Sequence, residues 1–144
     1  MNTTENEAPT HVFHSLKWIE RFAFFDQHGS PQTPEFKAAL DKLPSNKQQL
    51  IRINISAFFF GPIYLLILGM WRKFIGILAI NFVLTLIVAC MELALGPTGI
   101  FELILCIGLI NAIVFSTSTN YGCYLTRIKG SKSWNPYEGM RWFS

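Results

Sequence analysis

The chain contains few charged residues, and its longest apolar stretch contains almost none. Charged side chains make up 15% of the 144 residues, below the roughly 25% of an average soluble domain. Between Phe74 and Thr126 only Glu92 and Glu102 are charged. No basic stripe with interleaved aromatic residues occurs, so we expect no nucleic-acid partner. The shortage of charge instead predicts that lipid surrounds much of the chain.

Residues with reactive or metal-binding side chains are also scarce. Of the three histidines, His11 and His14 could share a helix face, but they lack a nearby acid or thiol of the kind that a zinc site needs. The sequence has no HExxH motif, no phosphate-binding glycine loop and no nucleophile–base set. We therefore expect no metal, no cofactor and no catalytic residue, and a protein that is not an enzyme. The three cysteines form no C-x-x-C pair, but Cys90 and Cys106 lie at similar distances from a turn, which leaves a disulfide between them open.

Two apolar runs on either side of a short turn are the strongest positive signal. Phe74–Leu95 holds 22 residues, which as a helix is about 33 Å long and can span a bilayer. The second run begins at Ile100 and becomes polar after Phe115, and the turn between the runs is Gly96–Gly99. The pattern predicts a transmembrane helical hairpin with crossings at 74–95 and 100–125.

Basic residues at the ends of the hairpin predict its orientation. Arg72 and Lys73 precede the first run, and Arg127 and Lys129 follow the second. Because Lys and Arg beside a crossing stay in the cytoplasm, both ends of the hairpin should be cytoplasmic and its turn outside. With Trp71, these four residues are the candidates for contact with the membrane interface and its anionic headgroups. The first ten residues contain no signal peptide, so we expect the N-terminus on the same side.

The segment 51–70, which precedes the hairpin, admits two interpretations. It is apolar but is interrupted by Gly61-Pro62, which weakens a helix and removes an amide donor. It either crosses the membrane with a kink, giving three crossings, or forms an interfacial or re-entrant helix on the cytoplasmic side. The first alternative requires about fifty residues with twelve charges to be translocated without a signal, so we prefer the second.

Residues 1–50 are predicted to form an amphipathic helical region in the cytoplasm. Apolar residues recur at three- and four-residue spacing in the first helix, which Gly29 ends. Thr33 and Pro34 form a strong start for the second helix, and Pro44 ends it. Ser45 and Gln48 match a capping box that opens a third helix. The three predicted helices span His11–Gln27, Pro34–Leu43 and Ser45–Phe60. The alternation from Ile51 to Ile55 could also form a strand, but the preceding cap favours a helix.

Small and polar residues within the hairpin are candidates for helix packing. Gly108, Ala112 and Ser116 repeat every four residues and would let another helix approach closely. Asn81 is expected to lie level with the polar layer Ser118–Asn120 and to hydrogen-bond across the hairpin. The same polar residues could instead line a path for a polar solute, which is the alternative interpretation.

Two sequence blocks resemble a known family. Asn54-x-x-Ala57-Phe58-Phe59-Phe60-Gly61-Pro62-Ile63-Tyr64, followed by Gly69-Met70-Trp71-Arg72-Lys73, is similar to the signature of the DUF2628 family of small bacterial membrane proteins. Asn120-Tyr121-x-x-Tyr124 and the tail Ser133–Met140 also resemble members of that family. The resemblance covers about residues 50–140 and implies a bacterial inner membrane. It implies no catalytic residues, because the family has no assigned activity.

The sequence thus predicts an all-α, multi-pass inner-membrane protein with a cytoplasmic C-terminus. It divides into the helical region 1–50, the membrane region 51–126 and a basic, aromatic tail 127–144. The expected function is that of a non-enzymatic interaction or regulatory subunit, and the alternative is a component of an oligomeric transporter or pore for a small polar solute. The expected partners are a bilayer with anionic headgroups and either a second copy of the chain or another membrane protein.

Overall fold

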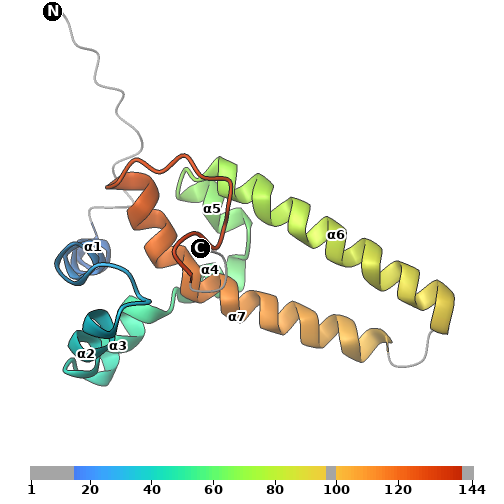
Figure 1. The fold of residues 1–144 in the computed structure, drawn as a ribbon, viewed down its shortest axis with the longest axis horizontal. Coiled ribbons are helices and arrows are strands. Elements are labelled where there is room, and N and C mark those ends of the chain that lie inside the picture. The colour runs from blue at the N-terminus through green and yellow to red at the C-terminus, as the bar shows by residue number, and fades with distance from the viewer. Residues whose placement is uncertain (1–14, 97–99, 141–144) are drawn as a thin grey trace, which may run out of the picture.

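A computed structural model describes residues 15–96 and 100–140 of the chain. Within these ranges seven helices follow one another and no strand occurs, which confirms the all-α prediction (Figure 1). The turn residues 97–99 and the predicted helix start at His11 lie outside the described residues. The helices are α1 (Leu16–His28), α2 (Pro34–Asp41), α3 (Ser45–Arg52), α4 (Ile55–Phe60), α5 (Ile63–Ile67), α6 (Trp71–Leu95) and α7 (Ile100–Arg127).

Helices α1 to α3 form a small head around aromatic side chains. Gly29 ends α1 with a φ of 74°, and the Thr33 hydroxyl accepts a hydrogen bond from the Phe36 amide at the start of α2, both as predicted. Phe25 and Phe36 stack with their ring centroids 5.8 Å apart. Both are buried, together with Leu40, Ile51 and Tyr124. Because Tyr124 belongs to α7, the core of the head is completed by the hairpin.

The third predicted helix is wrong in two respects. Ser45 is the first residue of α3 rather than its cap, and the Gln48 side-chain amide donates to the Leu43 carbonyl instead of closing a capping box. The helix also stops at Arg52, where Ile53 becomes extended with φ −119° and ψ 134°. Asn54 then caps a new helix, α4, by accepting from the Ala57 amide. A local cap and a long-range contact of Asn54, described below, outweigh the apolar pattern that favours one continuous helix.

The segment before the hairpin forms two short helices and not one long helix. Helix α4 has six residues and α5 has five, and Gly61 separates them with a φ of 54°. The break predicted at Gly61-Pro62 is therefore present. Neither helix approaches the ~20 residues that a crossing requires. Helix α4 packs mainly against α7, and α5 packs against α6.

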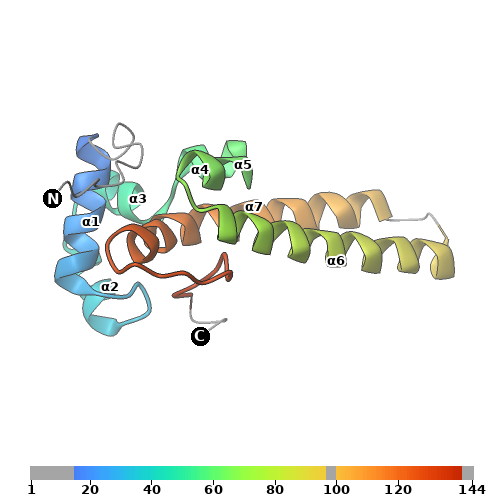
Figure 2. The same ribbon diagram turned by 90° about the horizontal axis from the view of Figure 1, so that it is seen from above.

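Helices α6 and α7 form the long arm of the molecule. They have 25 and 28 residues, and both are long and apolar enough to cross a membrane. Figures 1 and 2 show them running antiparallel and projecting away from all other elements, which gather at the opposite end. Large apolar side chains on the arm are exposed, among them Phe82 at 70% and Leu93 at 90%. We call the end where the other elements gather the base of the hairpin.

Candidate functional site at the base of the hairpin

The last third of α7 is polar yet buried, and the helix itself satisfies its hydroxyl groups. The side chains of Ser116, Thr117, Ser118 and Thr119 each donate to a carbonyl three or four residues earlier in α7. Such back-bonding lets hydroxyl-bearing residues lie in apolar surroundings without a distant partner. The head and the tail can therefore cover this part of α7 at little cost in unpaired polar groups.

An asparagine pair joins the head to α7. The Asn54 amide nitrogen donates to the Asn120 carbonyl oxygen at 3.0 Å, and Asn120 donates to the Ile51 carbonyl at 2.9 Å. Both side chains are almost fully buried. The Asn54 backbone amide also donates to the Ser116 carbonyl. Arg21 of α1 donates to the Leu50 carbonyl at 2.8 Å from the other side. The extended residues between α3 and α4 thus gain hydrogen bonds that their own helices do not supply.

The described part of the tail beyond α7, residues 128–140, folds back across the base between α6 and α7 (Figures 1 and 2). Its backbone passes so close to α6 that a Cβ on Gly76 would collide with the Trp134 carbonyl oxygen. The Arg72 guanidinium donates to the Lys132 carbonyl at 3.0 Å. It also lies over the rings of Trp71 and Trp134, at 5.3 and 5.8 Å from their centroids. These contacts fix the path of the tail along α6.

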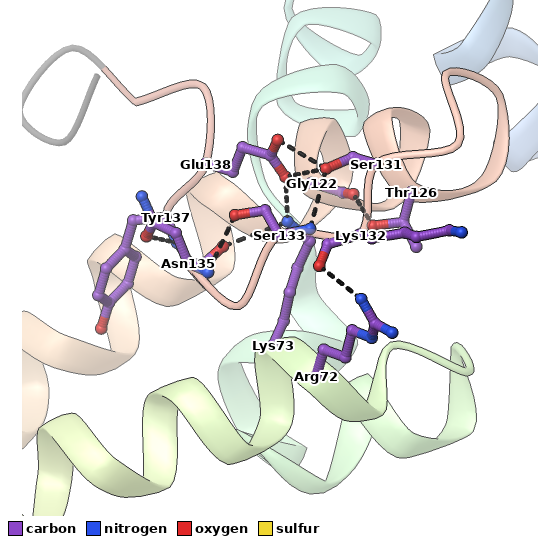
Figure 3. Close-up of polar contacts among 10 residues, drawn as sticks. All are labelled: Arg72, Lys73, Gly122, Thr126, Ser131, Lys132, Ser133, Asn135, Tyr137 and Glu138. Carbon is purple, nitrogen blue, oxygen red and sulfur yellow. Dashed lines mark hydrogen bonds and ion pairs between the residues drawn. The ribbon is translucent and has the colours of Figure 1, made fainter.

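A buried lysine forms the centre of this tail contact. Lys73 is 2% exposed, and its ammonium group pairs with the Glu138 carboxylate and donates to the Asn135 carbonyl (Figure 3). Ser131 donates to the same carboxylate at 2.7 Å. A buried ammonium without a counter-charge would be very unfavourable. Lys73 therefore requires the tail in place, and the tail is held by Lys73.

A second polar connection lies deeper in the hairpin. Asn111 donates to the Asn81 side chain at 2.7 Å and accepts from the Tyr137 hydroxyl, also at 2.7 Å. Burial raises the pKa of Tyr137 to about 12, so this residue stays a neutral donor. The predicted contact of Asn81 with the layer Ser118–Asn120 is wrong. Asn81 lies 15 residues before Gly96 and Asn111 lies 12 after Gly99, so residues at nearly equal distances from the turn meet.

The predicted membrane-interface residues divide into inward and outward groups. Lys73 lies inside the protein, which corrects the expectation that it faces headgroups. Arg127 also turns inward and donates to the Leu68 carbonyl at 2.7 Å, which fastens α5 to the end of α7. Trp71 is 51% exposed and Lys129 is exposed. Lys129 pairs with Asp26 at 3.3 Å, and hydrogen bonds from Tyr124 and Lys129 lower the pKa of Asp26.

The predicted helix-packing residues are not brought together against one neighbour. Ser116 is buried beneath the segment that leads into α4, and Ala112 is half-buried. Gly108 is exposed, and apart from its own turn of α7 no atom of the described residues would lie within 4 Å of a Cβ added to it. Close helix packing at Gly108 therefore stays a prediction. Cys90 and Cys106 are exposed free thiols.

The site holds no reactive constellation in the part of the chain that the structure describes. No group of three or more His, Cys, Asp or Glu residues suited to a metal occurs among residues 15–96 and 100–140. The carboxylate of Glu138 is occupied by Lys73 and Ser131. Sequence reasoning missed the pairing of Lys73 with Glu138, because nothing in the sequence shows that the tail returns to the start of α6.

Comparisons with known proteins place the chain among bacterial proteins of unknown function. A family model described as "Protein of unknown function (DUF2628)" matches residues 2–128. The chain is similar to "Uncharacterized protein YigF" of Salmonella typhimurium, with 38% identity over 125 residues that cover 84% of this chain and 90% of that protein. The protein of the same name from Escherichia coli K12 is 36% identical over the same shares. No solved structure matches. The family match begins earlier than the resemblance noted in the sequence and ends at Ile128, before most of the tail.

Removing the charge of Glu138 should loosen the base. Glu138→Gln leaves the Lys73 ammonium buried without a counter-charge, and we expect a loss of about 3 kcal/mol in stability. Thermal unfolding in detergent measures this loss, with the exposed Glu102→Gln as a matched control. Lys73→Met in addition should recover much of the stability, because the uncompensated charge is then absent. If Glu138→Gln unfolds at the same temperature as Glu102→Gln, the ion pair does not hold the tail.

Adding one methyl group to α6 should displace the tail. In Gly76→Ala the new Cβ collides with the Trp134 carbonyl oxygen, which is backbone and cannot rotate away. Gly108→Ala is the matched control, since it adds the same group in open space and should gain about 0.5–1 kcal/mol from helix propensity. Limited trypsin digestion should cleave after Lys132 faster in Gly76→Ala only. Equal cleavage in both variants would contradict the observed path of the tail.

Proposed function

Because the chain belongs to the DUF2628 family of proteins of unknown function, we propose a function from its own geometry. It is an integral protein of the bacterial inner membrane in which a two-helix hairpin anchors a folded cytoplasmic base. It acts as a non-enzymatic interaction or regulatory subunit. The proposal rests on one observation, the separation of a bare apolar arm from a base that collects nearly all buried polar contacts.

The exposed surface of the arm supports insertion into a bilayer. Outward-facing residues along α6 and α7 are large and apolar, from Ile75 to Leu93 on α6 and from Phe101 to Ile113 on α7. In water such a surface would strongly favour aggregation, whereas a lipid environment solvates it. Both helices satisfy their backbone hydrogen bonds internally, as a lipid-exposed segment must. Glu92 and Glu102 are exposed near the far end of the arm, where they would reach the opposite surface.

Helices α4 and α5 suit a position in the cytoplasmic leaflet beside the base. Their outer surface exposes Ile55, Phe59, Phe60 and Ile63, each at more than 60%. The backbone at the break between them is hydrogen-bonded, since the Gly61 amide donates to the Ala57 carbonyl and the Tyr64 amide donates to the Gly61 carbonyl. A short, bonded and outwardly apolar segment is compatible with a re-entrant or interfacial helix pair. This arrangement gives two crossings, with the head and tail on the same side.

Charge favours a cytoplasmic base. Arg72, Arg127, Lys129 and Lys132 lie at the base, whereas the described residues at the far end carry only glutamates. Positive residues beside short crossings are retained in the cytoplasm. Outside the protein core, Trp71, Arg72 and Trp134 form an exposed aromatic and basic surface suited to anionic headgroups.

The distribution of polar groups favours interaction over transport. Asn111 donates to Asn81 and accepts from the Tyr137 hydroxyl, so these side chains join the two helices and the tail on the inner face of the hairpin. The uncovered surfaces include the arm, with Gly108 in open space, the outer surface of α4 and α5, and the aromatic and basic surface of the base. A second copy or another membrane protein can pack on the arm, and headgroups can contact the base.

Topology tests the proposal. Cys90, Cys106 and Cys123 are first replaced by alanine, and single cysteines are then introduced at Glu102 and Lys132, which are both exposed. An impermeant thiol reagent applied to intact spheroplasts should label Glu102→Cys and should label Lys132→Cys only after the membrane is permeabilised. Glu35→Cys in α2 should behave like Lys132→Cys, because the head is also cytoplasmic.

Each contrary result has a distinct meaning. Labelling of Lys132→Cys in intact spheroplasts reverses the orientation and contradicts the proposal. Labelling at Glu35 but not at Lys132 requires a third crossing before α6. Recovery of the protein in the soluble fraction after carbonate extraction rejects membrane insertion altogether.

A further inference from the structure

A cavity of about 540 Å³ lies where the head, α7 and the tail meet. Its walls come from three parts of the chain: the head up to Arg52, the turn of α7 around Ser118, and the tail at Glu138–Met140. The volume is in the range of small-molecule sites, roughly 300–1,000 Å³. It is too small for a complete two-chain phospholipid. None of the contacts described above fills this space.

The floor of the cavity is apolar. Phe25, Phe36, Leu40 and Ile51 line it and are each no more than 4% exposed. Phe25 meets Tyr121 of α7 edge-on, with centroids 5.2 Å apart. A lining of aromatic and aliphatic side chains favours an apolar ligand body over a polar one.

The polar part of the wall has an excess of positive charge. Glu138 is neutralised by Lys73, which leaves Lys37, Asp41 and Arg52 as the charged groups that line the cavity. Lys37 and Arg52 are exposed, and no ion pair of either occurs among the described residues. A ligand with an anionic group would therefore find two available cations beside an apolar floor.

The position of the cavity points to a ligand that comes from the membrane. Thr117 and Ser118 line it and lie about one turn beyond Ile113, an exposed apolar residue of the arm. An amphiphile in the cytoplasmic leaflet could thus move from the arm into the cavity with its headgroup at the surface. This step rests on the proposed function, because it requires the arm to be in the bilayer.

We propose that the cavity binds a single-chain anionic lipid. The acyl chain lies against Phe25, Phe36 and Tyr121, and the carboxylate or phosphate group is held by Lys37 and Arg52. Binding would join the head, α7 and the tail around one ligand. The base would then report the presence of free fatty acids or lysophospholipids in the inner leaflet.

Photo-crosslinking tests the proposal. The full chain in nanodiscs of neutral phospholipid is irradiated with a diazirine-bearing palmitate, and the adducts are located by mass spectrometry. Adducts should occur on the peptides that contain Phe25, Phe36 or Tyr121. Excess palmitate or lysophosphatidate should compete with the probe, whereas an uncharged monoacylglycerol should compete about tenfold less well. The stronger of the two anionic competitors identifies the headgroup.

Two sets of variants make the result specific. Lys37→Gln with Arg52→Gln should lower cavity labelling about tenfold or more, while Lys17→Gln with Lys42→Gln, which changes two exposed lysines outside the cavity, should not. Thr117→Phe fills the space and should also abolish labelling. Trypsin resistance of the head and tail shows that each variant is folded.

The outcomes separate this proposal from the proposed function. Labelling confined to the arm, or equal competition by the uncharged lipid, overturns the anionic site even when the thiol labelling places the base in the cytoplasm. A reversed topology rejects the proposed function, and cavity labelling that persists in that case shows that the site itself is real.

Discussion

The buried ammonium of Lys73 is the constraint on which the base depends. A charge removed from water must be matched within the protein, and here the Glu138 carboxylate and the Asn135 carbonyl come from the tail. The tail reaches Lys73 by passing α6 at Gly76, where no side chain blocks it. Its last described residues then complete the cavity beside the head. One ion pair thereby links the end of the chain to the start of the arm.

The base also accommodates the last third of α7, which is polar although the rest of the arm is apolar. The hydroxyl groups bond back to their own helix, and Asn120 is matched by Asn54 and the Ile51 carbonyl. The head therefore packs on this part of α7 and leaves the rest bare. The polar groups of the hairpin are used for assembly, and the proposed function accordingly relies on surfaces and not on catalysis.

Features determined by local sequence could be predicted, and those determined by distant partners could not. Neighbouring residues determine the end of α1 at Gly29, the start of α2 at Thr33, the break at Gly61 and the length of the arm. The inward turn of Lys73 depends on Glu138, 65 residues later in the chain. The split between α3 and α4 depends on the contact of Asn54 with Ser116 and Asn120. The pairing of Asn81 with Asn111 could have been predicted, because the two residues lie at similar distances along the chain from the turn.

Hydrogen–deuterium exchange of the full chain in nanodiscs tests the central claim, that the tail is an integral part of the base. The amides of Asn54, Tyr137 and Met140 are hydrogen-bonded in the structure. They should exchange slowly and together, and Glu138→Gln should accelerate Tyr137 and Met140 while the middle of α6 keeps its protection. Exchange of Tyr137 and Met140 in the unaltered protein at the rate of an unstructured peptide would contradict the account.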